Sequence, residues 1–345
     1  IWNPETEVAF VRALRKKLCE RGLENIEIWP NDHSFAYSDK VDWQLSEYPE
    51  LREEIGGGYL DLIAKIENQS GYDNIEEICE HCDGIMVARG DMGVEVPFEQ
   101  LPAIQKKLIT KCRMLGKRVI TATEMLESMI TKPRPTRAEI SDVANAVYDG
   151  TSAIMLSGET AAGAFPIEAV SIMSKIAETA ERSIDYKSKF YSTEFKIKNS
   201  SDAVSHATCA MAMDINAKAI VACTISGMTA RMVSRFRSPV DIIGLTTDEV
   251  TWRKLSLSWG VTPKLCEKFT STDVLFYCAK KMATESLSLC EGDKIVITGS
   301  DQTGATGKTN LIKIDDICRD IEVGGVFLGK VVNILPIGAQ VELKP

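Results

Sequence analysis

The amino-acid sequence predicts an α/β fold in two parts: an incomplete α/β barrel followed by a smaller α/β domain. Three observations predict it. The chain has 345 residues, and because domains commonly hold roughly 100–200 residues, two domains are expected. The first part repeats a strand-then-helix unit, whereas the second has short apolar runs at a different spacing. The apolar fraction of 44% and charged fraction of 26% are ordinary for globular proteins and exclude global disorder.

Four short apolar runs between residues 62 and 160 are the predicted strands of the first part. Each ends in polar residues and is followed by a stretch with helical spacing, and the units recur at roughly 30 residues, the length of a strand with its crossover helix. Such connections make neighbouring strands parallel. Polar residues at every strand end then predict a partial (β/α)8, TIM-type barrel with its site at the carboxyl rim. The runs are 62–67, 84–91, 118–123 and 153–159.

The stretches between these runs carry helix signals. Residues 98–115 place apolar side chains at spacings of three and four, and Gly116 ends that helix. Thr136 and Glu139 form a capping box at the start of the next helix. Pro166 opens a third helix, since proline fits the first helical turn. Strand and helix therefore alternate throughout this part.

The chain divides into three segments. Residues 1–186 are the expected partial barrel, in which 30–61 fits no barrel unit. Residues 187–320 are the expected three-layer α/β/α domain, whose polar start, 187–201, lacks periodicity and is predicted to be a linker. Residues 321–345 predict a short β tail. The predicted strands of the second domain are 218–223, 241–246, 261–265, 293–298 and 310–314, separated by helices at 202–216, 229–237 and 272–289.

Charge, hydropathy and cysteine content argue against several classes of protein. The chain has 40 Lys+Arg against 49 Asp+Glu, a net charge of −9, which gives no electrostatic footprint for duplex nucleic acid. No apolar run approaches the ~18–20 residues of a membrane helix, and no signal-peptide pattern is present. Ten scattered cysteines predict reduced thiols in a cytoplasmic protein. Cys79 and Cys82 have the spacing of half a zinc site, but metal-free thiols are the favoured interpretation.

A lysine and two carboxylates form the candidate site. Glu67 and Asp91 end neighbouring predicted strands, so both can reach one position at the rim. Two carboxylates, completed by water and substrate oxygens, suit Mg²⁺ or Mn²⁺. Lys65 lies two residues before Glu67 on the same strand face, and an ammonium beside a metal ion suits a transferred phosphoryl group. A structural ion pair of Lys65 with a carboxylate is the alternative, and the pattern leaves both open.

Four long motifs carry a family resemblance. In order and spacing they resemble pyruvate kinase, and the similarity continues to about residue 315. The resemblance implies transfer of a phosphoryl group from phosphoenolpyruvate to ADP, giving pyruvate and ATP in the last step of glycolysis. It also implies Mg²⁺ (or Mn²⁺) and K⁺ as cofactors. The motifs are 63–68 (IAKIEN), 86–93 (MVARGDMG), 132–139 (KPRPTRAE) and 154–160 (IMLSGET).

The resemblance implies a role for each residue of the site. Lys65 would be catalytic and stabilise the phosphoryl group during transfer. Glu67 and Asp91 would bind the metal ion. The backbone amides of Gly90 and Asp91, together with the hydroxyl of Thr123, would hold the substrate carboxylate, and amides at a loop leading into a helix are suited to bind anions.

Four neighbouring residues have supporting or alternative roles. Ser157 is a candidate for the relay that protonates the enolate, and a capped strand end is an equal alternative. Arg89 and Glu95 are expected to be ion-paired supports and not catalytic. Glu124 stands where the family usually has an amide. Its charge could shift metal affinity or be solvated without effect, and the second outcome is favoured.

A loop of the second domain is a candidate phosphate site. The hydroxyls of Thr224, Ser226 and Thr229, with the amides near Gly227, lie between a predicted strand and a helix and could bind an anion. A plain Ser/Thr-rich turn is the alternative. In the resembled family this loop holds the phosphate of an allosteric sugar phosphate, and the Gly-rich stretch 304–309 would complete the pocket.

The resemblance also implies parts that this sequence is not expected to contain. In the family, eight barrel strands carry a small β domain inserted in their first half, which supplies the K⁺ ligands and much of the nucleotide site. Only the last four strands are expected here. The alternative function is therefore a catalytically incomplete chain that binds a sugar phosphate and acts as a regulatory or oligomerisation partner. A homo-oligomer, commonly a tetramer, is expected by resemblance.

Overall fold

The computed structural model describes side chains and backbone over three ranges, and backbone alone over two more. The first group is 61–267, 272–300 and 309–317; the second is 329–335 and 338–343. Most of the atypical segment 30–61, and residues 304–308 of the Gly-rich stretch, lie outside them. Within the described ranges, no helix is both long and apolar enough to cross a bilayer.

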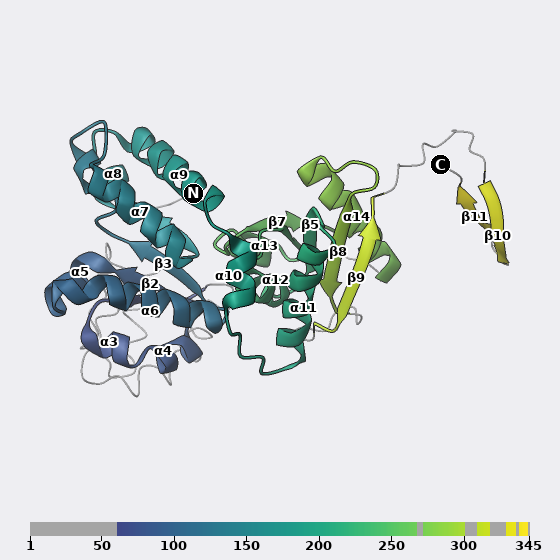
Figure 1. The fold of residues 1–345 in the computed structure, drawn as a ribbon, viewed down its shortest axis with the longest axis horizontal. Coiled ribbons are helices and arrows are strands. Elements are labelled where there is room, and N and C mark those ends of the chain that lie inside the picture. Colours follow the sequence, from purple (N-terminus) through teal and green to yellow (C-terminus); the bar gives the residue numbers. More distant parts are fainter. Residues whose placement is uncertain (1–60, 268–271, 301–308, 318–328, 336–337, 344–345) are drawn as a thin grey trace, which may run out of the picture.

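The first domain contains the four predicted strands in a parallel sheet of order β1-β2-β3-β4. This confirms the predicted partial barrel. In Figure 1 the sheet and its helices form one end of the ribbon, and α9 and α10 lead to the second domain. The strands are β1 (Ile63–Ile66), β2 (Gly84–Ala88), β3 (Arg118–Ala122) and β4 (Ala153–Met155).

Helices connect these strands as predicted. In α6, Ile104, Leu108 and Cys112 share one buried face against the sheet. The capping box of Thr136 and Glu139 is present at the start of α7. The helices are α3 (Gln69–Asp73), α4 (Ile75–His81), α5 (Arg89–Glu95), α6 (Leu101–Met114), α7 (Arg137–Asp149), α8 (Gly158–Ala161) and α9 (Pro166–Arg182), with 3-10 turns η1 (Phe98–Gln100) and η2 (Glu127–Ile130).

Two predicted strands are shorter than the sequence indicates, and one predicted linker contains a helix. The run 84–91 stops being a strand at Ala88, because residues from Arg89 onward form α5. Likewise β4 ends at Met155, and Glu159 belongs to α8. The linker 187–201 begins with α10 (Tyr186–Ser192), where the Asp185 side chain caps the helix and Phe190 is buried. One apolar anchor in a polar stretch was too weak a pattern to predict this helix.

The second domain has a five-stranded sheet of order β7-β6-β5-β8-β9, in which β9 is antiparallel to β8. All five predicted strands are present. Helix α13 was not predicted, and the Asp248 side chain caps it. The elements are α11 (Ser200–Asp214), β5 (Ala219–Cys223), α12 (Met228–Ser234), β6 (Asp241–Thr246), α13 (Glu249–Leu255), β7 (Val261–Leu265), α14 (Thr272–Leu287), β8 (Lys294–Gly299) and β9 (Leu311–Asp316).

Alternate residues of β5 pack into different cores. Ile220 and Ala222 join the cluster that contains residues of α11, α12 and α13. Ala219 and Val221 join a separate cluster with the apolar face of α14. Because successive strand side chains point to opposite sheet faces, helices cover both faces, and the predicted three-layer α/β/α arrangement is confirmed.

The predicted β tail is a two-stranded antiparallel pair, β10 (Gly329–Leu335) with β11 (Gly338–Leu343). The segment limits 1–186, 187–320 and 321–345 stay predictions.

The two domains are joined by buried arginines. Arg118 of β3 pairs with Asp61, which also pairs with Lys254 of α13 at 2.9 Å. Arg118 also donates to the Lys254 carbonyl at 3.0 Å. From the other side, Arg235 donates to the carbonyl of Met114 at 3.1 Å. Charge-assisted hydrogen bonds of this kind fix orientation as well as contributing energy.

Candidate functional site

Lys65, Glu67 and Asp91 converge at the carboxyl ends of β1 and β2. The Lys65 ammonium contacts the Glu67 carboxylate and lies 3.0 Å from Oδ2 of Asp91. Lys65 and Glu67 share a strand face, as the two-residue spacing predicts. Asp91 arrives from the first turn of α5, directly after β2. The Lys65 side chain is 13% exposed and that of Asp91 is 55% exposed, so the cluster has a buried base and an open side.

The three charges act on one another. Burial lowers the pKa of Lys65, but its hydrogen bonds and ion pairs with Glu67 and Asp91 outweigh burial, and the net pKa is raised. Burial raises the pKa of Glu67; Lys65 opposes this rise and the nearby charge of Asp91 adds to it. Lys65 therefore stays protonated at neutral pH. Two adjacent carboxylates with only one ammonium between them carry negative charge that a further cation would compensate.

The donor set fits a hard divalent cation. Two carboxylates with an open side suit Mg²⁺ or Mn²⁺, which commonly take one or two carboxylates and complete their shell with water and substrate oxygens. In the described part of the chain, no group of three or more His, Cys, Asp and Glu side chains comes together to hold a metal. The protein's share at this site would be Glu67 and Asp91. Because protonation of Glu67 competes with a metal ion, affinity should fall as pH falls through its raised pKa.

Gly90 and Thr123 are neighbours at the same rim. The Gly90 amide donates to Oγ1 of Thr123 at 2.8 Å, and this hydroxyl donates to the Ala122 carbonyl at 2.7 Å. Thr123 and Glu124 both have left-handed backbones, with φ of 65° and 51°. Such conformations are strained for residues other than glycine. The turn after β3 thus places the Thr123 hydroxyl beside the first turn of α5, and Glu124 is exposed.

Arg89 holds this strained turn, and no local pattern predicted its partner. Its guanidinium donates to the Thr123 carbonyl at 2.6 Å and to the Glu124 carbonyl at 3.0 Å. Its other edge binds both carboxylate oxygens of Asp142 on α7, at 2.8 and 2.6 Å. Arg89 is an ion-paired support, as expected. The expectation for Glu95 is not met, since no ion pair of Glu95 occurs within the described ranges.

Ser157 and Glu159 organise the loop after β4. The buried Glu159 carboxylate accepts from the Ser157 amide at 2.8 Å and from the Leu126 amide at 2.9 Å. The hydroxyl of Ser157 is buried and has no hydrogen-bond partner among the described residues. It makes no capping bond to α8, so its capping interpretation lacks the bond that would support it. Pattern analysis placed Glu159 only as a strand end and missed this bridging role.

The candidate phosphate loop lies in the second domain, after β5. Gly227 is the N-cap residue of α12 and has a left-handed φ of 79°. Ser226 is exposed, whereas Thr229 is buried and its hydroxyl lies 2.8 Å from that of Thr309. This bond joins the loop to the last residue of the Gly-rich stretch. Thr224 is anchored by its amide, which donates to the Leu245 carbonyl at 2.9 Å.

The cysteine pair noted for its zinc spacing lies in the core of the first domain. Cys79 and Cys82 are both buried. Cys79 Sγ lies 3.8 Å from Cys112 Sγ on α6. Contacts with neighbouring thiols, together with burial, raise the pKa of both residues of the pair, which is the environment of unreactive thiols.

Comparison with known proteins identifies the family of the chain. The protein-family model for the pyruvate kinase barrel domain matches residues 44–170. The family model for the pyruvate kinase alpha/beta domain matches residues 202–315. The chain belongs to the pyruvate kinase family. It is 50% identical over 296 residues to the pyruvate kinase of Clostridium acetobutylicum, a match covering 82% of this chain and 62% of that protein. The resemblance inferred from the four motifs is thereby confirmed.

Further relatives extend the match. Identity to the pyruvate kinase of Staphylococcus aureus MRSA252 is 49% over 323 residues, covering 90% of this chain and 55% of that protein. The crystal structure of a pyruvate kinase from Cryptosporidium parvum superposes with a TM-score of 0.75 at 37% identity, covering 82% of this chain and 58% of that one. The chain spans between 55% and 62% of the length of these curated relatives.

Proposed function

We propose that this chain carries the phosphoryl-transfer site that moves a phosphoryl group from phosphoenolpyruvate to ADP. The observation that supports the proposal is the convergence of the Lys65 ammonium with the carboxylates of Glu67 and Asp91 at an open rim. A transferring phosphoryl group spreads negative charge over its oxygens, so a fixed cation beside it lowers the barrier. Lys65 supplies that charge at neutral pH because its pKa is raised.

Each remaining residue would position substrate or move a proton. Glu67 and Asp91 would hold Mg²⁺, which when bound neutralises charge on the phosphoryl oxygens. The amides of Gly90 and Asp91 and the Thr123 hydroxyl would bind the carboxylate of phosphoenolpyruvate. To do so, the Gly90 amide would exchange its present acceptor, Thr123 Oγ1, for a substrate oxygen.

Ser157 is proposed to act after transfer. Loss of the phosphoryl group leaves the enolate of pyruvate, which must gain a proton at carbon. The Ser157 hydroxyl is buried without a partner among the described residues, so it is available to pass a proton on. Glu159 fixes the backbone of Ser157 through its amide.

The loop after β5 is proposed to hold the phosphate of a sugar-phosphate effector. Thr224, Ser226, Gly227 and Thr229 supply hydroxyl and amide groups where a strand leads into a helix. The Thr229–Thr309 contact at 2.8 Å supports a pocket formed jointly with the Gly-rich stretch. K⁺ dependence and homo-oligomerisation are proposed from the family alone.

A coupled assay of pyruvate formation tests the proposal. Full-length chain is supplied with phosphoenolpyruvate, ADP, Mg²⁺ and K⁺, with and without sugar phosphate, and compared with Lys65→Met. Lys106→Met, an exposed lysine on α6 outside the site, is the matched control. We expect turnover in the wild type and the control, and a loss of at least about 10³-fold in Lys65→Met. Absence of turnover in the wild type would contradict the activity and identify the chain as catalytically incomplete.

A half-reaction separates an incomplete nucleotide site from a defective metal site. Exchange of the pyruvate methyl protons with D₂O, followed by NMR, needs enolate formation but no phosphoryl acceptor. We expect metal-dependent exchange that Ser157→Ala slows. If full turnover is absent but exchange persists, the cluster is functional and the deficit lies in nucleotide binding. If both are absent, the proposed roles at the rim are wrong.

A further inference from the structure

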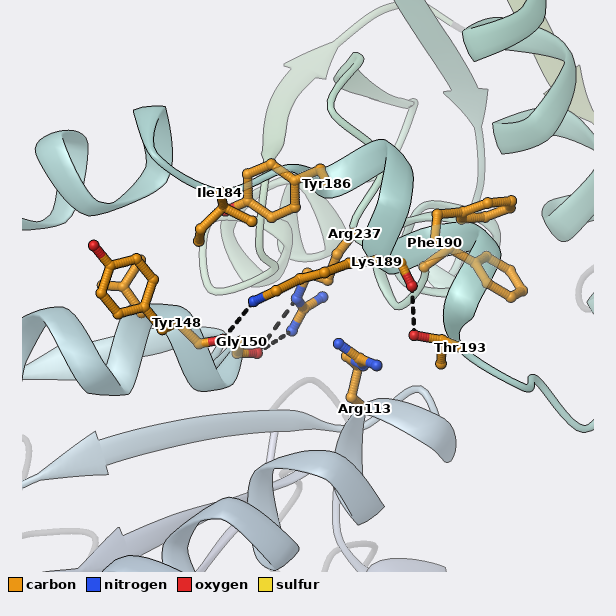
Figure 2. A pocket seen from close by; sticks show the side chains of 11 residues that line it. Arg113, Tyr148, Gly150, Ile184, Tyr186, Lys189, Phe190, Thr193 and Arg237 are labelled. Atoms are coloured by element: carbon orange, nitrogen blue, oxygen red, sulfur yellow. Dashed lines mark hydrogen bonds between the residues drawn. The ribbon is translucent and has the colours of Figure 1, made fainter.

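A second pocket lies between the two domains, outside the site described above. The space between its lining atoms is about 320 Å³, part of which is open to solvent. Figure 2 shows its wall, with Arg113 rising from the end of α6, the end of α7 at Gly150, and Lys189 reaching in from α10. Arg237, which follows α12, enters from the second domain. Phe190 and Phe236 give the pocket an aromatic side.

The lining carries three cations and no carboxylate. Arg113, Lys189 and Arg237 are its charged residues. In Figure 2 the guanidinium groups of Arg113 and Arg237 face each other at the centre, and the exposed Lys189 reaches the Tyr148 carbonyl at the pocket wall. Burial lowers the pKa of Arg237, and the charge of Arg113 lowers it further. Like charges packed together in a buried site are costly unless an anion compensates them.

The acceptors already present are neutral. Arg237 donates to the Ser234 carbonyl at 2.7 Å and to the Gly150 carbonyl at 3.1 Å. The Lys189 ammonium donates to the Tyr148 carbonyl at 3.0 Å. These carbonyls satisfy hydrogen bonds but leave the net positive charge in place.

Of the three cations, Arg113 is the one with a buried donor that lacks a hydrogen-bond acceptor among the described residues. Its Nε is buried and has no hydrogen-bond partner among the described residues, and the same is true of the Tyr186 hydroxyl in the same wall. Its one described stabilising contact is the ring of Phe195, 5.9 Å from Cζ. Burial raises the pKa of Tyr186, and the charge of Glu181 on α9 adds to this rise, yet within the described ranges no carboxylate pairs with Arg113 or Arg237.

We propose that this interdomain pocket binds a small oxyanion, a phosphate group supplied either as free inorganic phosphate or by a small phosphomonoester. Guanidinium groups present paired donors that match phosphate oxygens. Two of them, with an ammonium and an unpartnered phenol hydroxyl, provide donors on several sides of one anion. The site is distinct from the loop at 224–229. That loop follows the carboxyl end of β5 and leads into α12, whereas Arg237 lies beyond the other end of α12.

Binding here would connect the domains. Arg113 belongs to the first domain and Arg237 to the second, so an anion between them contacts both. Without an anion the two guanidinium groups repel each other across the interface. With one they share a ligand, and the interdomain contact is strengthened. The pocket therefore couples anion concentration to the attachment of the two domains.

The test compares Arg113→Met with Lys111→Met in the full chain. Lys111 is an exposed lysine on the same helix, two residues earlier, so the control removes the same charge outside the pocket. Thermal unfolding is followed while inorganic phosphate or glycerol phosphate replaces chloride at constant ionic strength. Both variants keep the active site and the loop at 224–229, so the difference between them isolates this pocket.

We expect a saturable rise in Tm with phosphate in the wild type and Lys111→Met, and the loss of that component in Arg113→Met. Arg113→Lys should restore part of it, and Tyr186→Phe should weaken it without removing a charge. A larger response to glycerol phosphate than to inorganic phosphate would assign a phosphomonoester. Equal responses of wild type and Arg113→Met would overturn the proposal. So would an anomalous map of a selenate-soaked crystal without a peak between Arg113 and Arg237.

Discussion

The two sheets of this chain differ in how completely they are covered. In the second domain, β5 is buried along its whole length, and β6 and β8 at all but their first residue. In the first domain only the central strands β2 and β3 are largely buried. The outer strands β1 and β4 are mostly half-exposed, and within the described residues each pairs on one side only.

The two sheets differ in the cover of their faces more than in their edges. The second domain has helices on both faces of its sheet, and its outer strands β7 and β9 are themselves partly exposed. Within the described residues the first sheet likewise ends in two edge strands, β1 and β4, which are open to further strand pairing. Lys65 lies on the edge strand β1 and Glu67 follows it directly. The proposed chemistry therefore depends on an edge strand of the less buried sheet.

The most direct expected effect is in hydrogen exchange. Amides of β5 and β8 should be protected at least about 100-fold more strongly than those of β1 and β4, because exchange follows local opening and opening is easiest where few buried contacts hold a strand. Hydrogen exchange followed by mass spectrometry measures this directly. Equal protection of the two sets would show that the half-barrel is as stable as the domain beside it.

Substitutions in the two sheets should lower the free energy of unfolding by different amounts. Ile220→Ala removes a fully buried side chain of β5 and should cost about 3–4 kcal/mol, within the range for such cavities. Ile63→Ala, in the half-exposed β1, should cost about 1–2 kcal/mol, because folding removes less of this side chain's apolar surface from water. Urea denaturation of both variants gives the comparison. A larger cost for Ile63→Ala would reverse the ranking of the two sheets.

The third prediction concerns the support of the strained turn. Arg89→Met leaves Asp142 without its cation and frees the carbonyls of Thr123 and Glu124. We expect a loss of about 2–3 kcal/mol, less than for a fully buried pair because the Asp142 side chain is 37% exposed. Asp142→Asn is the control that keeps a hydrogen-bond acceptor. If both variants unfold at the wild-type urea midpoint, the turn does not depend on Arg89.

The smallest expected effect concerns the contact between the domains. Burial raises the pKa of Asp61, but Lys254 and Arg118 outweigh it and the net pKa is lowered below 3.8. A carboxyl group with a lowered pKa stabilises the fold above its unfolded pKa, and this contribution is lost as pH falls through the folded value. Asp61→Asn should therefore be about 1 kcal/mol less stable at pH 7, with the gap closing toward pH 3. A gap independent of pH would exclude this ion pair as its source.

Local patterns predicted much of the fold and the centre of the site. The repeat of strand and helix identified all four barrel strands, and the two-residue spacing placed Lys65 and Glu67 on one face. Asp91 could be placed beside them because neighbouring parallel strands end at the same rim. The motif resemblance then identified the family.

Contacts between distant residues could not be predicted in the same way. Nothing near Arg89 in the sequence points to Asp142, which lies 53 residues away. The left-handed backbones of Thr123 and Glu124 lack the glycine that usually marks them. The pocket of Arg113 and Arg237 exists only because two domains meet, so neither residue stands out within its own helix or loop.

The central claim is that Glu67 and Asp91 hold a divalent cation beside Lys65, and Mn²⁺ titration of the full chain, with free ion followed by electron paramagnetic resonance, tests it most directly. Glu67→Gln is compared with Glu95→Gln, an exposed acid on α5. We predict one site per chain, unchanged in Glu95→Gln and weakened at least about tenfold in Glu67→Gln, since even supporting groups at metal sites contribute that much. Equal Mn²⁺ affinity in wild type and Glu67→Gln would contradict the account.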